Sequence, residues 1–269
     1  MSSNETTLKC KPKRYLWVDN LKMFACLLVV IGPLYMSMMA GGWISENNIL
    51  YCWPIQTVYT FHVPLFFVCS GFLYQATAPN EWNVKKHIGN IKKKALALGV
   101  PYVTFSTITL LLKNVFDTDV NNAAPPFLKT LLIEPIAPYW YLYTLFLLFC
   151  LIPPATGKGK RKTLVSMVVI ACFMKIIYVG WLADKAIPDL VAKVMASAVW
   201  FCIGMLITAT PFKKSKLADG IAAGIMILAC ILSYFVYGTP TDNAKVQFIF
   251  ASIFVLVITY FFQSKEQYK

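Results

Sequence analysis

The side chain best suited to chemistry in this sequence is His62, one of two histidines in 269 residues. It lies within an apolar stretch, and Phe66 and Ser70 follow at spacings of four that place them on the same face of a helix. Imidazole is the usual general base near neutral pH, and ionisable groups at bilayer depth are usually functional. His62 is therefore a candidate to deprotonate a hydroxyl group. The alternative is a structural histidine that hydrogen-bonds to a neighbouring helix.

Basic residues form the second candidate feature. Lys92, Lys93 and Lys94 directly precede the third apolar segment, where a helix N-terminus adds its own partial positive charge. Such a group suits a phosphate-bearing donor. Asp19 and Lys22 share a helix face and could form an ion pair. All of these residues could instead simply mark a membrane boundary, and both interpretations stay open here.

Aromatic residues follow the longest connection, residues 116–136, which contains three acids. Trp140 and Tyr141 lie just beyond it and could bind a sugar at the outer face, or form the aromatic belt that is common at membrane boundaries. The histidines and the eight cysteines show no metal-ligand spacing, so no metal site is expected.

Composition indicates which elements hold these residues. The chain is 58% apolar and 14% charged, whereas a soluble domain is roughly 45–50% apolar and about 25% charged. This excludes an ordinary water-soluble globule, and disorder even more firmly. A bilayer core needs roughly 20 apolar residues per helix. Eight such segments are present, at about 22–40, 52–75, 96–115, 137–155, 163–182, 190–210, 217–237 and 246–263.

These segments predict an all-α integral membrane protein, a polytopic bundle of about eight transmembrane helices. The connections are too short for a separate soluble domain, so one transmembrane domain is expected at 15–263. A basic cytoplasmic tail at 1–14 precedes it, and a short cytoplasmic tail at 264–269 follows it.

The charge pattern predicts the orientation. A net charge of +13 would suggest nucleic acid as the partner of a soluble protein, but here the charges lie in short clusters between apolar segments. Nineteen of the 25 basic residues fall on one side of the alternating connections and five on the other, with Lys175 alone inside a segment. By the positive-inside rule the chain is N-in and C-in. We expect a multi-pass protein of the cell membrane, with the lipid bilayer and no nucleic acid as partner.

Two motifs resemble those of membrane acyltransferase family 3. The first is RYLWVDNLK, from Arg14 to Lys22, followed by LLVVIG; the second is HVPLFF from His62 with SGF from Ser70, which is closest to the fucose-acetylase-like branch. Weaker agreement comes from later landmarks, which are Lys93, Lys94, Pro101, Tyr102, Ser106, WYL from Trp140 and WFCIG from Trp200.

The resemblance implies an integral O-acyltransferase. Such an enzyme moves an acyl group, commonly acetyl, from cytoplasmic acyl-CoA to a hydroxyl of a cell-envelope glycan or related acceptor. It implies His62 as the catalytic base and acyl-CoA as the co-substrate. The donor-binding residues would be Lys22, Lys92, Lys93 and Lys94, and the supporting motif residues Asp19, Ser70, Trp140 and Tyr141.

The sequence departs from the family at one important position. The family places a histidine after a basic residue with ten residues between them; here the basic residue is Lys22 and the histidine position holds Pro33. Residues 33 and 62 are expected at similar depth in the first helical hairpin. The eight segments are also fewer than is usual in the family.

These departures leave other functions open. One is an inactive or truncated family member that acts as a binding or scaffold protein, and a less favoured one is a transporter. A homo-oligomer is also left open.

Overall fold

The computed structural model describes residues 14–263 except 46–47, 80, 82, 116–128, 130, 132–134, 136–138, 183–184, 186 and 238–242. The predicted N-terminal tail except Arg14, the predicted C-terminal tail and most of the acidic connection at 116–136 lie outside the described residues.

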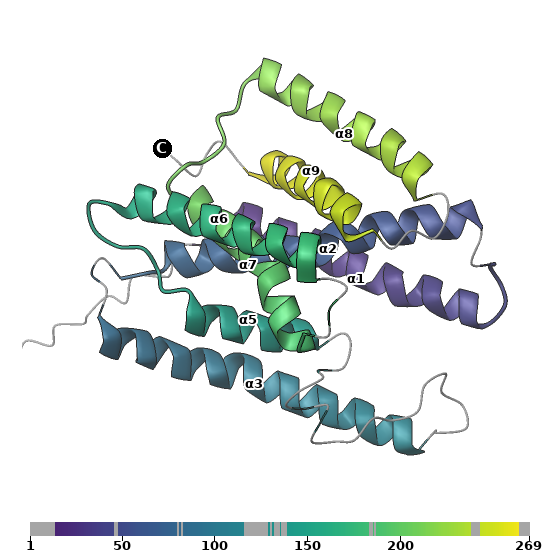
Figure 1. Cartoon of the computed structure of the whole chain (residues 1–269), viewed down its shortest axis with the longest axis horizontal. Coiled ribbons are helices and arrows are strands. Elements are labelled where there is room, and N and C mark those ends of the chain that lie inside the picture. The colour runs from purple at the N-terminus through teal and green to yellow at the C-terminus, as the bar shows by residue number, and fades with distance from the viewer. Residues whose placement is uncertain are drawn as a thin grey trace, which may run out of the picture.

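The described chain is helical and contains no strand, which confirms the predicted class (Figure 1). A helix overlaps each of the eight predicted segments. Seven of these helices are long and apolar enough to cross a membrane. The elements are α1 (Leu16–Ala40), α2 (Ile49–Ala76), α3 (Val84–Val115), α5 (Trp140–Leu151), α6 (Lys160–Ile177) with the short π-helix η1 (Tyr178–Leu182), α7 (Asp189–Ile207), α8 (Lys216–Val236) and α9 (Ala244–Phe262).

Local sequence explains where several helices begin. Asn48 and Asn243 each precede a helix, and their side chains accept hydrogen bonds from backbone N–H groups of the first turn. Ser215 does the same for α8. These are the residue types that satisfy unpaired N–H groups at a helix start. The apolar segments that follow continue as helices because hydrocarbon offers no other partner to the backbone.

α2 is the central helix of the bundle. It packs against α1, α7 and α9, while α8 lies against α9 and α3 lies beside α5 (Figure 1). The contact with α7 is made by backbone: a Cβ atom added at Gly71 would lie 2.0 Å from the carbonyl oxygen of Phe201, and one at Gly204 would lie 2.1 Å from that of Val68. Only glycine allows helices to approach so closely.

One predicted segment differs from expectation. Instead of a full crossing at 137–155, the chain forms α5, whose 12 residues rise about 18 Å, against a hydrocarbon core of roughly 30 Å. The chain that follows α5 is held to α2 by two hydrogen bonds. The Gln75 amide donates to the Ala155 carbonyl at 2.8 Å and accepts from the Ala155 N–H at 2.9 Å.

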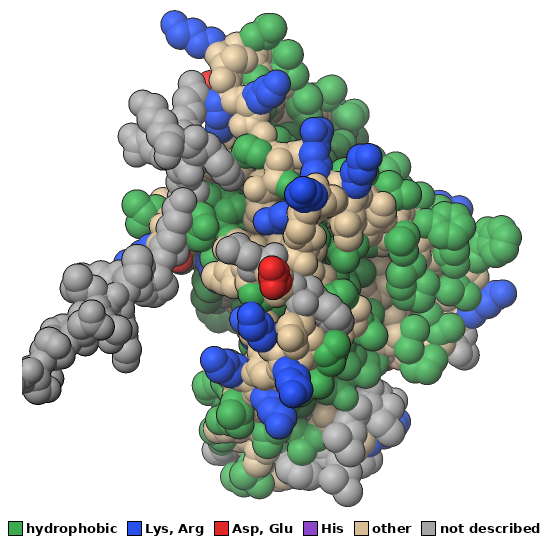
Figure 2. All heavy atoms as spheres, turned by 90° about the vertical axis from the view of Figure 1, so that its left-hand side faces the viewer, with side chains coloured by type: hydrophobic (Ala, Val, Ile, Leu, Met, Phe, Trp, Pro, Cys, Tyr) green, Lys and Arg blue, Asp and Glu red, His purple; other side chains and the backbone are tan. Residues whose placement is uncertain are grey.

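One end of the bundle carries most of the basic residues, and we call it the basic end. It holds the C-terminus of α2 and the N-termini of α3, α6 and α8. Figure 2 looks onto this end and shows Lys and Arg side chains gathered there, with hydrophobic side chains along the flanks. This is the end that the charge pattern predicts to be cytoplasmic.

Candidate functional site

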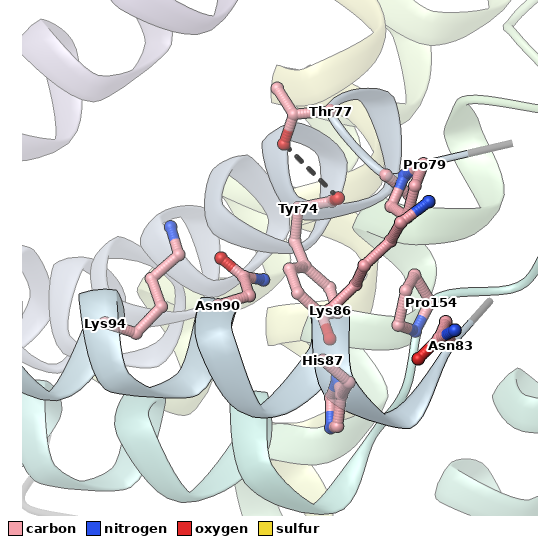
Figure 3. Close-up of a pocket in the computed structure, with 10 residues that line it drawn as sticks. Tyr74, Thr77, Pro79, Asn83, Lys86, His87, Asn90, Lys94 and Pro154 are labelled. Atoms are coloured by element: carbon pink, nitrogen blue, oxygen red, sulfur yellow. Dashed lines mark hydrogen bonds between the residues drawn. The ribbon is translucent and has the colours of Figure 1, made fainter. Parts of the chain in front are cut away.

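A pocket of about 210 Å³ opens at the basic end (Figure 3). It lies between the end of α2, the first turns of α3 and Pro154. On the α3 side of the pocket, polar residues occur at a regular spacing. Lys86, Asn90 and Lys94 are four residues apart and so project from one side of the helix. No carboxylate is among the described residues that line the pocket, which are Tyr74, Thr77, Ala78, Pro79, Asn83, Lys86, His87, Asn90, Lys94 and Pro154. This lining suits an anionic ligand.

Tyr74 lines this pocket and carries a buried, unpaired hydroxyl. Its side chain is 4% exposed and packs edge-to-face against Phe149, at 5.0 Å between ring centroids. The hydroxyl has no hydrogen-bond partner in the described part of the chain. Figure 3 shows the ring pointing from α2 toward α3, between Asn90 and Lys86. A buried hydroxyl without a partner costs about 1–3 kcal/mol, so a ligand or water that bonds to it is favoured.

The prediction that Lys92, Lys93 and Lys94 precede the third helix is wrong, because α3 already begins at Val84, and of these three lysines only one lines the pocket. Lys94 is partly buried and its ammonium lies 4.6 Å from the centroid of the Phe149 ring. Lys92 and Lys93 are exposed. Lys22 of α1 is partly buried and lies within electrostatic range of Lys94, so two of the predicted donor-binding residues approach each other.

The predicted pair of Asp19 with Lys22 is not the one that forms. Asp19 accepts a hydrogen bond from the Arg14 guanidinium at 2.6 Å instead. Arg14 lies just before α1, and its long side chain extends forward to Asp19 in the first turn. Asp19 is therefore paired with Arg14 and not with Lys22.

His62 lies midway along α2 and is 7% exposed. Its Nδ1 is 2.8 Å from the carbonyl oxygen of Val58. A carbonyl can only accept a hydrogen bond, so Nδ1 carries the proton and, in the neutral ring, Nε2 keeps its lone pair. Tyr59 packs edge-to-face on the imidazole at 5.0 Å and fixes the plane of the ring. This tautomer is the one in which Nε2 can act as a base.

In the first helical hairpin, α1 and α2 approach each other closely at the depth of His62. Gly32 of α1 faces the Tyr59 ring so closely that a Cβ atom there would lie 2.6 Å from the tyrosine oxygen. Since Tyr59 is within one turn of His62 and Gly32 is next to Pro33, the prediction that residues 33 and 62 share a depth is confirmed. The Pro33 side chain is exposed.

Ser70 and Tyr141 come together between His62 and the pocket. Their hydroxyl oxygens are 3.3 Å apart, and the Tyr141 ring packs against Phe66 and Phe67. Ser70 is six residues before the end of α2, so α5 begins inside the bundle and not at the outer boundary. The expectation that Tyr141 lies at the outer face is wrong. Trp140 beside it lies under the Lys193 ammonium, at 5.2 Å from the ring.

Sequence reasoning missed part of the pocket. Tyr74, His87 and Asn90 were not among the candidates, although the four-residue spacing from Lys86 through Asn90 to Lys94 is a signal that could have found the α3 face. In the described residues, no three His, Cys, Asp or Glu side chains are grouped so that they could hold a metal ion.

Comparison with known proteins gives two matches. A family model described as an acyltransferase domain matches residues 15–267. Nodulation protein NolL of Mesorhizobium japonicum is 27% identical over 151 residues, which are 55% of this chain and 37% of that protein. The match thus spans little more than a third of the relative's length. No solved structure matches the chain.

Proposed function

The chain belongs to membrane acyltransferase family 3, and we propose that it transfers an acyl group, acetyl in the first instance, from cytoplasmic acyl-CoA to a hydroxyl group of a cell-envelope glycan or related acceptor. We place this acyltransferase in the cell membrane. The observation that carries the proposal is a line of polar groups along α2, which runs from the cationic pocket at Tyr74 past Ser70 to His62.

The pocket is the proposed site for the phosphate-bearing part of the donor. Lys86 and Lys94 supply cations, Asn90 and the Tyr74 hydroxyl supply neutral hydrogen-bond donors, and no carboxylate in the lining repels a phosphate. Charge-assisted hydrogen bonds to phosphate are roughly twice as strong as neutral ones. The exposed Lys92 and Lys93 add long-range attraction, which is screened by salt.

The acyl end of the donor must then reach His62. Tyr74 and His62 are separated by 12 residues of α2, a rise of about 18 Å. The paired hydroxyls of Ser70 and Tyr141 lie along this route, where they can hydrogen-bond to the amide groups of the long coenzyme A arm. Because α5 begins inside the bundle, Tyr141 can take part at this depth.

The transfer step uses His62 as general base. The acceptor hydroxyl oxygen attacks the thioester carbonyl carbon while Nε2 of His62 takes the hydroxyl proton. A C–O bond forms, the C–S bond breaks, and the proton passes to the leaving thiolate. The products are an acyl ester of the acceptor and coenzyme A. The Val58 carbonyl contributes by holding the imidazole in the tautomer that can accept a proton.

Pro33 is the observation that favours a second candidate, a family member that binds acyl-CoA without transferring the acyl group. Proline has no proton to transfer and removes one helical hydrogen bond. Tyr59, packed between Gly32 and His62, occupies the space beside this position on α2. The two candidates differ in whether His62 is sufficient as the base.

The test measures coenzyme A release by purified protein in lipid nanodiscs, with acetyl-CoA and isolated envelope glycan. We expect His62→Ala to slow release by about 100-fold or more, as is typical for a lost general base, while acetyl-CoA binding persists. Thr60→Val, on the same helix, is the control expected to retain activity; its hydroxyl only bonds to the Thr57 carbonyl. Equal rates for wild type and His62→Ala would overturn the catalytic role. Binding of acetyl-CoA without release, in wild type and in Pro33→His, would establish the second candidate.

A further inference from the structure

Lys175 is the lysine that lies farthest from either end of its apolar segment, and the proposed reaction does not use it. It lies on the buried face of α6, four residues after Ala171, which is 3% exposed. Phe173 and Ile176, on the opposite face, are 63% and 58% exposed, as expected of side chains that contact lipid. Lys175 therefore points toward the neighbouring helices and is partly buried.

Aromatic rings surround the ammonium group. Its Nζ lies 5.6 Å from the centroid of the Tyr178 ring and 5.6 Å from that of Phe248 on α9. Trp200 of α7 packs edge-to-face on Phe248 at 5.9 Å. An ammonium over an aromatic face gains about 0.5–2 kcal/mol. That is too little to offset an unpaired charge in a low-dielectric interior, which costs several kcal/mol.

Lys175 has no acidic partner in the part of the chain that the structure describes. The ion pairs found there join Arg14 to Asp19 and Lys193 to Asp189. Charged groups inside membrane segments usually pair with another charge or mark a binding site. An anionic ligand beside Lys175 would supply the negative charge that the described residues do not.

The local helix geometry closes one side of this site. Directly after Lys175 and two further residues, α6 changes into the π-helix η1, which packs against α7 and α9. Single π turns in a helix are often found at functional sites. Here the wider turn brings Tyr178 beside the ammonium while η1 covers the space between the helices.

The depth of Lys175 indicates the kind of anion. It is seven residues before Leu182, so its Cα lies about 10 Å from the end of the helix, and its ammonium lies beside the ring of Tyr178, which is three residues nearer to that end. A lysine at this depth reaches the level of the lipid headgroups with its ammonium. The anions present there in a membrane are the phosphates of lipids.

We propose that Lys175, Tyr178 and Phe248 form a binding site for the headgroup of an acidic phospholipid, at the end of the bundle opposite the donor pocket. The headgroup phosphate pairs with the ammonium. This site is independent of the acyl transfer reaction, so its test does not depend on the donor or the acceptor.

Lys193 provides a matched comparison on the neighbouring helix. It too lies over an aromatic ring, that of Trp140, but it is paired with Asp189. Its charge is already balanced within the protein, and it has no need of an external anion. Lys193→Met is therefore the control for Lys175→Met.

The test incorporates the purified protein into nanodiscs with equal parts of phosphatidylcholine and phosphatidylglycerol, and measures the lipids that stay bound by native mass spectrometry. We expect wild type to retain phosphatidylglycerol about fivefold over phosphatidylcholine. Lys175→Met should lose this preference, while Lys175→Arg and Lys193→Met should keep it. Thermal unfolding of each variant checks that it is folded, and Lys175→Gln replaces Lys175→Met if that variant does not fold.

Two results would overturn the proposal. One is a wild type without preference, or a Lys175→Met variant that keeps it. The other is thermal stabilisation of wild type by inorganic phosphate, in phosphatidylcholine alone, equal to that given by phosphatidylglycerol. That outcome would assign the site to a soluble phosphate and not to a lipid.

Discussion

At the basic end, α2 has α7 on one side and the first turns of α3 across the pocket on the other, and these two sides are built in opposite ways. Toward α7, Gly71 and Gly204 let the backbones touch, and Phe201 beside them is fully buried. Toward α3 there is an open pocket, an unpaired Tyr74 hydroxyl and a row of polar side chains.

The difference shows how α2 serves two purposes. Its contact with α7 leaves no free volume, so it holds the helix and its side chains His62, Ser70 and Tyr74 in fixed positions. Its separation from α3 leaves the volume that a ligand can occupy. In the proposed reaction, the rigid contact would position His62, and the open side would admit the donor.

The largest effect should come from a substitution that forces α2 and α7 apart. Gly71→Ala places a methyl group 2.0 Å from the Phe201 carbonyl oxygen, so the helices must separate. We expect a loss of stability of at least about 3 kcal/mol, or no folded protein, measured by thermal unfolding and size-exclusion chromatography.

Gly224→Ala of α8 is the matched control, since a Cβ atom there meets nothing within 4 Å. Replacing a mid-helix glycine at such a position should be neutral or should stabilise by about 0.5–1 kcal/mol. If Gly71→Ala and Gly224→Ala have the same thermal stability, the close contact between α2 and α7 does not hold α2 rigidly.

The second-largest effect should appear at the pocket between α2 and α3. Lys94→Ala removes the partly buried ammonium of the pocket, and we expect the KM for acetyl-CoA to rise roughly tenfold with little change in kcat, since a hydrogen bond to a charged group contributes about 1.5 kcal/mol or more. The measurement is a steady-state assay of coenzyme A release.

Lys162→Ala serves as its control, because Lys162 is an exposed lysine of the basic end that does not line the pocket. A similar rise in KM for both variants would mean that the whole basic surface, and not the pocket, attracts the donor.

The smallest effect is the most discriminating. Tyr74→Phe keeps the ring that packs on Phe149 and removes only the unpaired hydroxyl. If the donor bonds to this hydroxyl, the KM should rise about threefold to fivefold, corresponding to a hydrogen bond of about 1 kcal/mol. An unchanged KM together with a higher melting temperature would show that the hydroxyl is only a buried cost to stability.

Much of the fold could be predicted from the sequence, because hydrophobicity and charge are local properties. A helix overlaps each of the eight apolar segments, and Figure 2 shows the basic side chains on one end, as the alternation of clusters predicted. The similar depth of residues 33 and 62 followed from helix rise alone.

The candidate site could be predicted only in part. Lys92, Lys93 and Lys94 are equivalent in sequence, but successive residues of a helix point about 100° apart, so only one of them enters the pocket. Tyr141 was placed at a boundary because its segment is apolar enough to cross; nothing in the segment itself shows that α5 begins at the level of Ser70.

The sequence by itself determined the membrane class, the helical segments, their charged ends and the histidine at mid-depth. The tertiary structure alone decided which side chains share a site, because the pocket joins Tyr74 of α2 to Lys94 of α3 and Pro154 beyond α5. Helix periodicity fixes each face separately. How the faces are turned toward one another depends on packing between helices that are distant in the chain, above all the glycine contact between α2 and α7.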